Sequence, residues 1–159
     1  KIMSMYDKGF EFSNGQALST LNSTGVVSAN VWDLENKSSG VAMGQTDFMV
    51  FGWINMIILS TTNSTGKNFR ITLLSSSTAA LTGTIIYLAG LELMIPQIVA
   101  GNKFSFGVCL HKCEQYLGIW YKAATSLTGA TSVDCWFADG PITSPSDVGN
   151  QKKPNTSFA

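Results

Sequence analysis

The chain has 159 residues, of which 45% are hydrophobic and only 13% charged, and its ten basic and ten acidic residues give no formal net charge. A chain of this length is expected to form one domain with its own core. The zero net charge argues against a nucleic-acid-binding protein, because such proteins use surplus lysine and arginine to displace counterions from phosphates. The low charge favours a protein that stays in contact with other proteins.

Hydroxyl groups supply much of the polar character, with 18 serines and 15 threonines, and 15 glycines accompany only four prolines. This composition is typical of many short strands joined by turns. The first twelve residues lack the apolar core of an export signal. The most apolar run, residues 48–59, is shorter than the roughly 20 residues that a membrane-spanning helix needs. We therefore expect neither an export signal nor a membrane segment.

The chain is expected to begin with an irregular arm, residues 1–14, followed by a domain at residues 15–140. Within that domain apolar and polar residues mostly alternate, which predicts strands with one face on a core. The runs at residues 48–59, 85–91 and 117–121 are apolar on both faces and should be central strands, or strands whose outer face is covered. In chain order the expected strands are 26–34, 48–59, 69–73, 85–91, 104–110, 115–122 and 133–137.

Turn residues separate these strands. Asn63 to Gly66 and the pair Gly101-Asn102 predict turns, and residues 111–114 and 126–131 predict the loops of two hairpins. No crossover helix is evident between the strands, so antiparallel pairing is expected. The sequence therefore predicts an all-β fold, an antiparallel jelly-roll or β-sandwich of seven to eight strands with irregular N- and C-terminal arms.

The last segment, residues 141–159, is rich in Pro, Gly, Ser and Lys and should not fold on its own. It is either a frayed terminus or an arm that becomes ordered on a partner. Phe158, one residue from the end, favours the second interpretation.

The residues that could carry chemistry are few. The chain has three cysteines, Cys109, Cys113 and Cys135. An odd number favours free thiols in a reducing compartment over a disulfide scaffold. A zinc site made from them and His111 is disfavoured, because same-face residues of a straight strand lie about 6.8 Å apart and cannot share one ion. His111 is the only histidine, and no nucleophile or phosphate-loop motif accompanies it. We expect no catalytic residue, no metal and no cofactor.

Four tryptophans are spread over four expected strands. Trp136 has the opposite facing to Val133, Cys135 and Phe137. If those three residues fill the core, Trp136 points outward and is suited to anchor an interface. The alternative is that Trp136 itself fills the core and its neighbours face out.

Several segments resemble a known family. They are Ser28 to Leu34, the turn and strand from Ile98 to Gly107, and Gln115 to Tyr121 followed by Thr128-Gly129 and residues 133–137. Their order and spacing resemble the tailed-phage capsid cement (decoration) proteins with a jelly-roll fold, over roughly residues 1–140.

The resemblance implies a structural protein without enzyme activity. It would bind the outer surface of a phage capsid and bridge neighbouring subunits of the major capsid protein, as a homodimer or homotrimer, after assembly in the host cytoplasm. From position alone, we predict that five aromatic residues contact the capsid or another copy: Tyr6, Phe10, Phe12, Trp136 and Phe158. Two alternatives remain open, a carbohydrate- or receptor-binding β-sandwich of a phage fibre and a hydrolase built around His111.

Overall fold

The fold is seen in a computed structural model that describes residues 11–18, 21, 23–34, 50–60, 68–94, 97–111, 113–124 and 131–142. These residues form nine strands and no α-helix. The strands are β1 (Glu11–Ala17), β2 (Val26–Val27), β3 (Trp32–Asp33), β4 (Val50–Ser60), β5 (Asn68–Ser76), β6 (Ile85–Met94), β7 (Lys103–Leu110), β8 (Tyr116–Ala123) and β9 (Ser132–Ala138).

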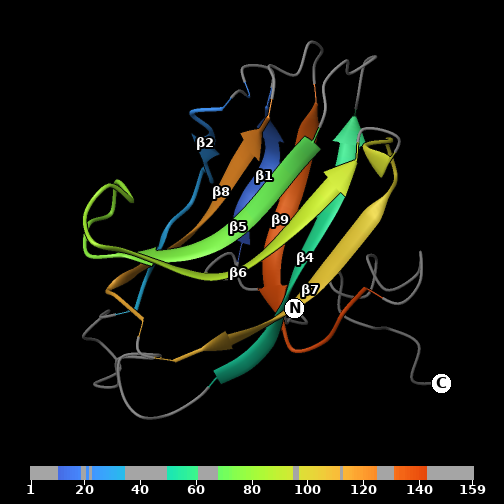
Figure 1. Ribbon diagram of the computed structural model, residues 1–159. Helices are drawn as coiled ribbons and strands as arrows, with labels where there is room; N and C mark the ends of the chain where they lie inside the picture. The colour runs from blue at the N-terminus through green and yellow to red at the C-terminus, as the bar shows by residue number, and fades with distance from the viewer. Residues whose placement is uncertain are drawn as a thin grey trace, which may run out of the picture.

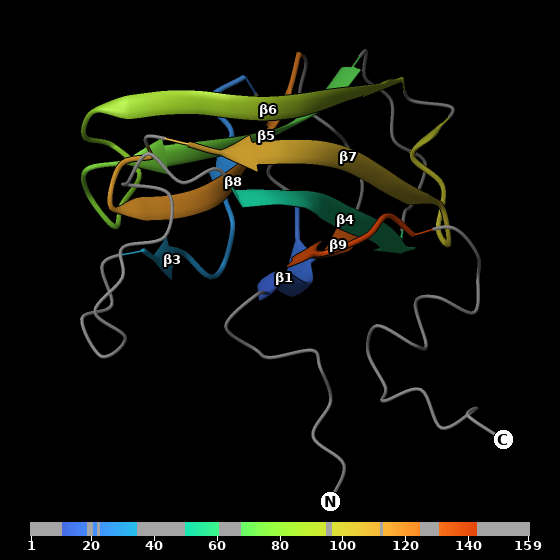
Figure 2. The same ribbon diagram turned by 90° about the horizontal axis from the view of Figure 1, so that it is seen from below.

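The strands pair into two antiparallel sheets that pack face to face (Figures 1 and 2). The first, sheet A, has the order β1-β9-β4-β7, and the second, sheet B, has the order β2-β8-β5-β6 with β3 also paired to β8. Figure 2 shows the sheets as layers, with β5 and β6 in the upper one and β1, β4 and β9 in the lower one. The predicted all-β antiparallel sandwich is confirmed.

Alternating side chains from both sheets fill the space between them. Ile54, Met56 and Ile58 of β4 face Phe69, Ile71 and Leu73 of β5 across a core that also takes in β8 and β9. The same period of two places polar or aromatic residues on the outer face of each sheet. The core residues with no measurable exposure include Leu18, Leu21, Ile54, Ile58, Phe69, Ile71, Leu73, Leu110, Leu117, Ile119, Tyr121, Val133 and Cys135.

The structure has nine strands instead of the expected seven to eight because one predicted strand is interrupted and because β1 was not among the expected strands. Residues 26–34 form the two-residue strands β2 and β3. Between them Ser28 turns the chain: its hydroxyl donates to the carbonyl of Asn30 and accepts from the amide of Ile119. The backbone amide of Asn30 then donates to the carbonyl of Phe12 in β1. The hydrogen bonding of this segment with β8 is therefore interrupted until β3.

The start of the domain was predicted too late. Strand β1 begins at Glu11, so residues 11–14 belong to the sandwich and not to an arm. Their pattern was missed because a bulge interrupts it: the pairing with β9 shifts register between Glu11 and Ser13, and again before Gln16. Gln16 holds this irregular strand by accepting from the Ser13 hydroxyl and the Ala29 amide.

Both predicted hairpins are wrong. Residues 111–114 link β7 of sheet A to β8 of sheet B, and β8 in turn leads to β9 of sheet A, so neither pair of strands is hydrogen-bonded together. Only β5 and β6 are both consecutive in the chain and paired among the described strands. A turn signal shows where a strand ends, but it does not show whether the chain returns beside that strand or crosses to the facing sheet.

The predicted turn at Gly101-Asn102 is confirmed. Gly101 has a φ of 88°, and its amide donates to the carbonyl of Ile58, whose own amide donates to Asn102. The other predicted turn, Asn63 to Gly66, lies outside the described residues.

Two of the three strands with apolar residues on both faces are central, as predicted, namely β4 in sheet A and β8 in sheet B. The third, β6, is the last strand in the order of sheet B. Its outer side is partly open: Tyr87 is 63% exposed and Met94 is 58% exposed. Central position is therefore not the reason for the apolar character of β6.

Candidate functional site

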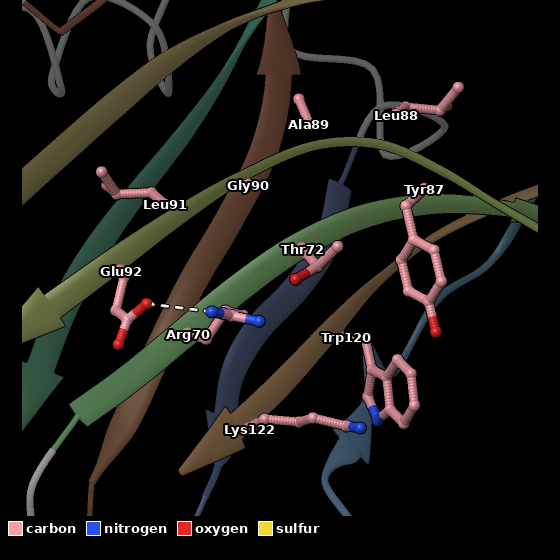
Figure 3. A pocket seen from close by; sticks show the side chains of 10 residues that line it. All are labelled: Arg70, Thr72, Tyr87, Leu88, Ala89, Gly90, Leu91, Glu92, Trp120 and Lys122. Atoms are coloured by element: carbon pink, nitrogen blue, oxygen red, sulfur yellow. Dashed lines mark hydrogen bonds and ion pairs between the residues drawn. The ribbon is translucent and has the colours of Figure 1, made fainter. Parts of the chain in front are cut away.

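A hollow of about 530 Å³ lies on the outer face of sheet B, over strands β5, β6 and β8 (Figure 3). We call it the sheet B groove. Its floor is the sheet itself, so three hydrogen-bonded strands hold its side chains in place. The lining residues are Arg70, Thr72, Tyr87, Leu88, Ala89, Gly90, Leu91, Glu92, Trp120 and Lys122.

Two aromatic rings form one end of the groove. The ring centroids of Tyr87 and Trp120 are 6.4 Å apart and the ring planes differ by only 13°. Trp120 points outward because its neighbours Ile119 and Tyr121 both point into the core. Figure 3 shows the two rings beside one another, on the same side of the sheet as Arg70 and Glu92.

Tyr87 owes its position to a break in the strand pattern. Gly90 and Glu92 lie on the outer face of β6, where they pair with Thr72 and Arg70 of β5. Strict alternation along β6 would place Leu88 on this outer face as well. The pairing of β5 with β6 shifts register opposite Leu73 and Leu74, which moves the outward position by one residue. The bulge therefore brings Tyr87 to the outer face.

Arg70 and Glu92 form the other end. The guanidinium of Arg70 donates to Glu92 at 3.0 Å, and the Asn68 amide group donates to the other carboxylate oxygen. The hydrogen bond from Arg70, with the one from Asn68, lowers the pKa of Glu92 below its usual value. The ammonium of Lys122 lies 3.5 Å from the centre of the Trp120 ring.

This lining is suited to recognition by stacking and hydrogen bonding. Its ten residues include two cations and one carboxylate, and that carboxylate is already bonded to Arg70. The threonine hydroxyl, the guanidinium and the carboxylate offer both donors and acceptors within one open surface. Acid–base cleavage of a glycosidic bond would require a second carboxylate, and the lining has none.

The outer face of sheet A is covered where residues 140–142 cross it. The Asn55 amide group donates to the carbonyl of Gly140, and the Ile142 amide donates to the hydroxyl of Ser105. Ser105 in turn donates to the Asn55 side-chain oxygen at 2.7 Å. The polar residue Asn55 is therefore fully buried although it lies on an outward row of the sheet.

The predicted contact residues are not found together on the surface. Phe12 is 2% exposed and belongs to the core between the sheets, because β1 is a strand of the sandwich rather than part of an arm. The prediction that Phe12 forms an interface is therefore wrong. Tyr6, Phe10 and Phe158 lie outside the described residues.

Trp136 requires a second correction. It pairs with Glu11 and Asn55 on the outward row of sheet A, while Val133 and Cys135 fill the core. Its direction is the predicted one, yet its exposure is 0%. It is a buried residue of a covered face, and not an exposed anchor.

The cysteines and the histidine do not form a metal site among the described residues, where no cluster of three potential ligands occurs. All three thiols are free. Cys135 lies in the core, where burial raises the pKa of its thiol to about 12. Burial also raises the pKa of Cys113, whereas Cys109 is partly exposed on the outward side of β7. The Nδ1 atom of His111 is buried without a hydrogen-bond partner in the described part of the chain.

Thiol labelling should separate these cysteines. At pH 8 we expect a disulfide reagent such as DTNB to titrate one thiol of the native chain, Cys109, and all three after unfolding in guanidinium chloride. The reason is that Cys113 and Cys135 are buried as neutral thiols. A Cys109→Ala variant should show no fast phase, and a second fast thiol in that variant would contradict the described burial.

The sequence does not predict the groove, although it contains part of the signal. Arg70 and Thr72 alternate with core residues of β5, and Trp120 alternates with core residues of β8 in the same way. The same alternation predicts an outward tryptophan in both β8 and β9, namely Trp120 and Trp136. Exposure could not be compared, because the covering segment at residues 140–142 is not evident from the strand pattern.

Comparisons of the sequence with family models and with curated proteins do not identify a relative. No family model matches the chain, and no curated protein matches its sequence. In the described part of the chain, the structure has no helix of the length and apolar character that crossing a membrane requires.

Proposed function

We propose that the protein is a structural capsid cement protein, which binds the outer surface of a tailed-phage capsid and bridges neighbouring subunits of the major capsid protein. The observation that carries the proposal is the strand order. When β2 and β3 count as one interrupted strand, the chain changes sheet at every connection except that between β5 and β6. This path through two four-stranded sheets supports a jelly roll, the fold that the resemblance to cement proteins implies.

The two ends of the described body suggest which side meets the shell. Strand β1 opens the body in sheet A, and residues 140–142 end it on the outer face of the same sheet. The described body therefore begins and ends at sheet A, whose strands β1, β4 and β9 form the lower layer of Figure 2. We propose that residues 1–10 and 143–159 carry the capsid contacts, with Tyr6, Phe10 and Phe158 as aromatic anchors.

Stabilisation of the shell would come from linkage. A protein that binds the assembled shell but not the free subunits stabilises the shell by about 2.7 kcal/mol per site at a concentration 100 times the Kd. A homodimer or homotrimer would engage several capsid subunits at once and gain avidity without new contacts. Hydrogen bonding and aromatic burial would dominate the contact, because the chain has few charges to offer.

The direct test is binding to capsids assembled from the major capsid protein alone. The full-length chain should co-sediment with these capsids to a fixed ratio per capsid subunit, and cryo-electron microscopy should place it on the outer surface. The coated capsids should also resist heating to a higher temperature. Recovery of the protein only in the unbound fraction, at concentrations well above that of the capsid subunits, would refute the proposal.

Deleting residues 151–159 should weaken capsid retention and leave the fold intact. The deletion removes Phe158 and starts nine residues beyond the last described one, Ile142. We expect the fraction retained after washing to fall at least tenfold, while the thermal unfolding midpoint stays within about 2 °C, because surface changes away from the core have small effects on stability. Equal retention by the shortened and full-length chains would show that the tail does not dock.

A further inference from the structure

We propose that the sheet B groove binds a saccharide. The inference goes beyond capsid binding and does not depend on it, since the groove lies on the opposite sheet from both ends of the described body. If the sheet A side meets the shell, the groove faces outward from the particle. A saccharide site there would let a decorated surface hold on to polysaccharide.

The first argument is the aromatic end of the groove. Sugars present C–H groups on the faces of their rings, and these pack on the electron-rich face of an aromatic side chain. Tyr87 is 63% exposed, although the hydrophobic effect favours covering a ring of this size. Its ring plane is within 13° of that of Trp120, and because the Lys122 ammonium lies over Trp120, Tyr87 offers the open aromatic face to a ligand.

The second argument is the mixture of polar groups along the groove. Sugar hydroxyls donate and accept hydrogen bonds, and they are matched by sites that also do both. Arg70 and Lys122 supply donors, Glu92 supplies an acceptor, and the Thr72 hydroxyl supplies both. An anion site would need donors alone, and the Glu92 carboxylate beside Arg70 would repel an anion.

The third argument is that the polar groups are already oriented. Arg70 and Glu92 are joined by a 3.0 Å contact, and Asn68 donates to the second oxygen of the carboxylate. Lys122 is positioned over the Trp120 ring, which leaves Tyr87 as the open stacking surface. Groups that are held before binding lose little freedom when a ligand arrives, which favours affinity.

The fourth argument is the open centre between the two ends. Gly90 pairs with Thr72 midway along the groove, as Figure 3 shows. A Cβ atom at Gly90 would come within 3.5 Å of the Thr72 hydroxyl and narrow this centre. The groove, at about 530 Å³, is within the range of roughly 300–1,000 Å³ that small-ligand sites occupy.

The test uses the full-length protein and defined oligosaccharides. The probes are maltoheptaose, cellohexaose, mannohexaose, N-acetylchitohexaose and a hyaluronan hexasaccharide, followed by a broader glycan array. We expect at least one of these glycans to bind with a Kd below about 1 mM, measured by isothermal titration. Tyr87→Ala should weaken that binding at least tenfold, and Thr72→Val at least threefold, with the unfolding midpoint unchanged.

A matched control is available in Phe51, which is 72% exposed and lies on β4 of the other sheet. Phe51→Ala removes an exposed aromatic ring of similar size, and it should leave saccharide binding unchanged.

Three outcomes would overturn the proposal. The first is the absence of any glycan hit, and the second is equal binding by wild type and Tyr87→Ala. The third is binding of inorganic polyphosphate as tight as that of any glycan, which would indicate a simple anion site. If Tyr87→Ala instead lowered capsid retention without any glycan hit, the groove would be a protein contact. Each outcome is distinguishable from failure of the capsid proposal, because the glycan measurement requires no capsid.

Discussion

Replacing Trp136 with alanine is expected to lower the free energy of unfolding by about 3–5 kcal/mol, the usual cost of deleting a large buried aromatic side chain. Trp136 has no exposed surface and pairs with Glu11 on one side and Asn55 on the other. Both of these polar neighbours are also buried. Removing the indole would therefore leave a void beside polar groups whose surroundings are fixed.

Chemical denaturation at pH 7 followed by circular dichroism would measure this loss. Phe51→Ala is again the control, because Phe51 lies in the same sheet but is 72% exposed, and its loss should change the free energy by less than about 0.5 kcal/mol. If Trp136→Ala changed stability by less than about 1 kcal/mol and abolished capsid retention, Trp136 would be the exposed anchor that the sequence suggested. The structure predicts the reverse.

The strands that could be predicted are those whose pattern depends only on neighbouring residues. The alternation of Phe69, Ile71 and Leu73 is the pattern of a strand with one buried face, and β5 has this structure. Strand β1 could not be predicted in this way, because its bulge breaks the period of two between Glu11 and Gln16. Its register depends on hydrogen bonds from Asn30 and to Gln16, which lie outside any local pattern.

The topology was less accessible than the strands. The loop at residues 111–114 has the composition of a hairpin turn, yet it joins strands of different sheets. Which sheet receives the next strand is decided by the packing of the whole sandwich and not by the loop residues.

The candidate site was the least accessible feature, since it depends on three strands at once. Tyr87 lies outward only because of the bulge opposite Leu73 and Leu74, and Arg70 meets Glu92 only through the pairing of β5 with β6. The sequence shows that Trp120 and Trp136 both point away from core neighbours. It does not show that Trp136 is covered while the face around Trp120 stays open.

The two outer faces of the sandwich therefore have different roles in our proposals. Sheet A carries buried polar residues, among them Glu11, Asn55 and Asp134, and the end of the described chain is bonded across it. Sheet B has an open groove whose charged side chains have partners: Arg70 is paired with Glu92, and Lys122 lies over the ring of Trp120. A body with one covered face and one open face is suited to bind a surface on one side and a ligand on the other.

A buried hydrogen bond between the two sheets is the basis of the second large expected effect, a loss of stability at alkaline pH. The hydroxyl of Tyr121, on β8, shares a hydrogen bond of 2.8 Å with Ser13 of β1, and Cys135 of β9 lies beside it. Burial is the main reason that the pKa of Cys135 rises to about 12 and that the pKa of Tyr121 rises well above its usual value. Both groups are held in their neutral, protonated form.

Stability should therefore fall steeply above pH 9. The unfolded chain releases the thiol proton near pH 9 and the phenol proton near pH 10, whereas the folded chain retains both. Each retained proton lowers the free energy of unfolding by about 1.4 kcal/mol per pH unit across that window, and below pH 9 the stability from both groups is complete. Urea unfolding at pH 8, 9, 10 and 10.5 would measure the slope.

Variants of the two groups should change that slope in a defined way. Cys135→Ala should remove the contribution of one proton to the slope above pH 9, about 1.4 kcal/mol per pH unit. Tyr121→Phe should remove the same contribution above pH 10. Val133→Ala, a non-titrating core change in the same strand, should lower stability at every pH and leave the slope unchanged. A wild-type slope in Cys135→Ala would mean that this thiol ionises equally in the folded and unfolded chains, which contradicts its full burial in the core between the two sheets.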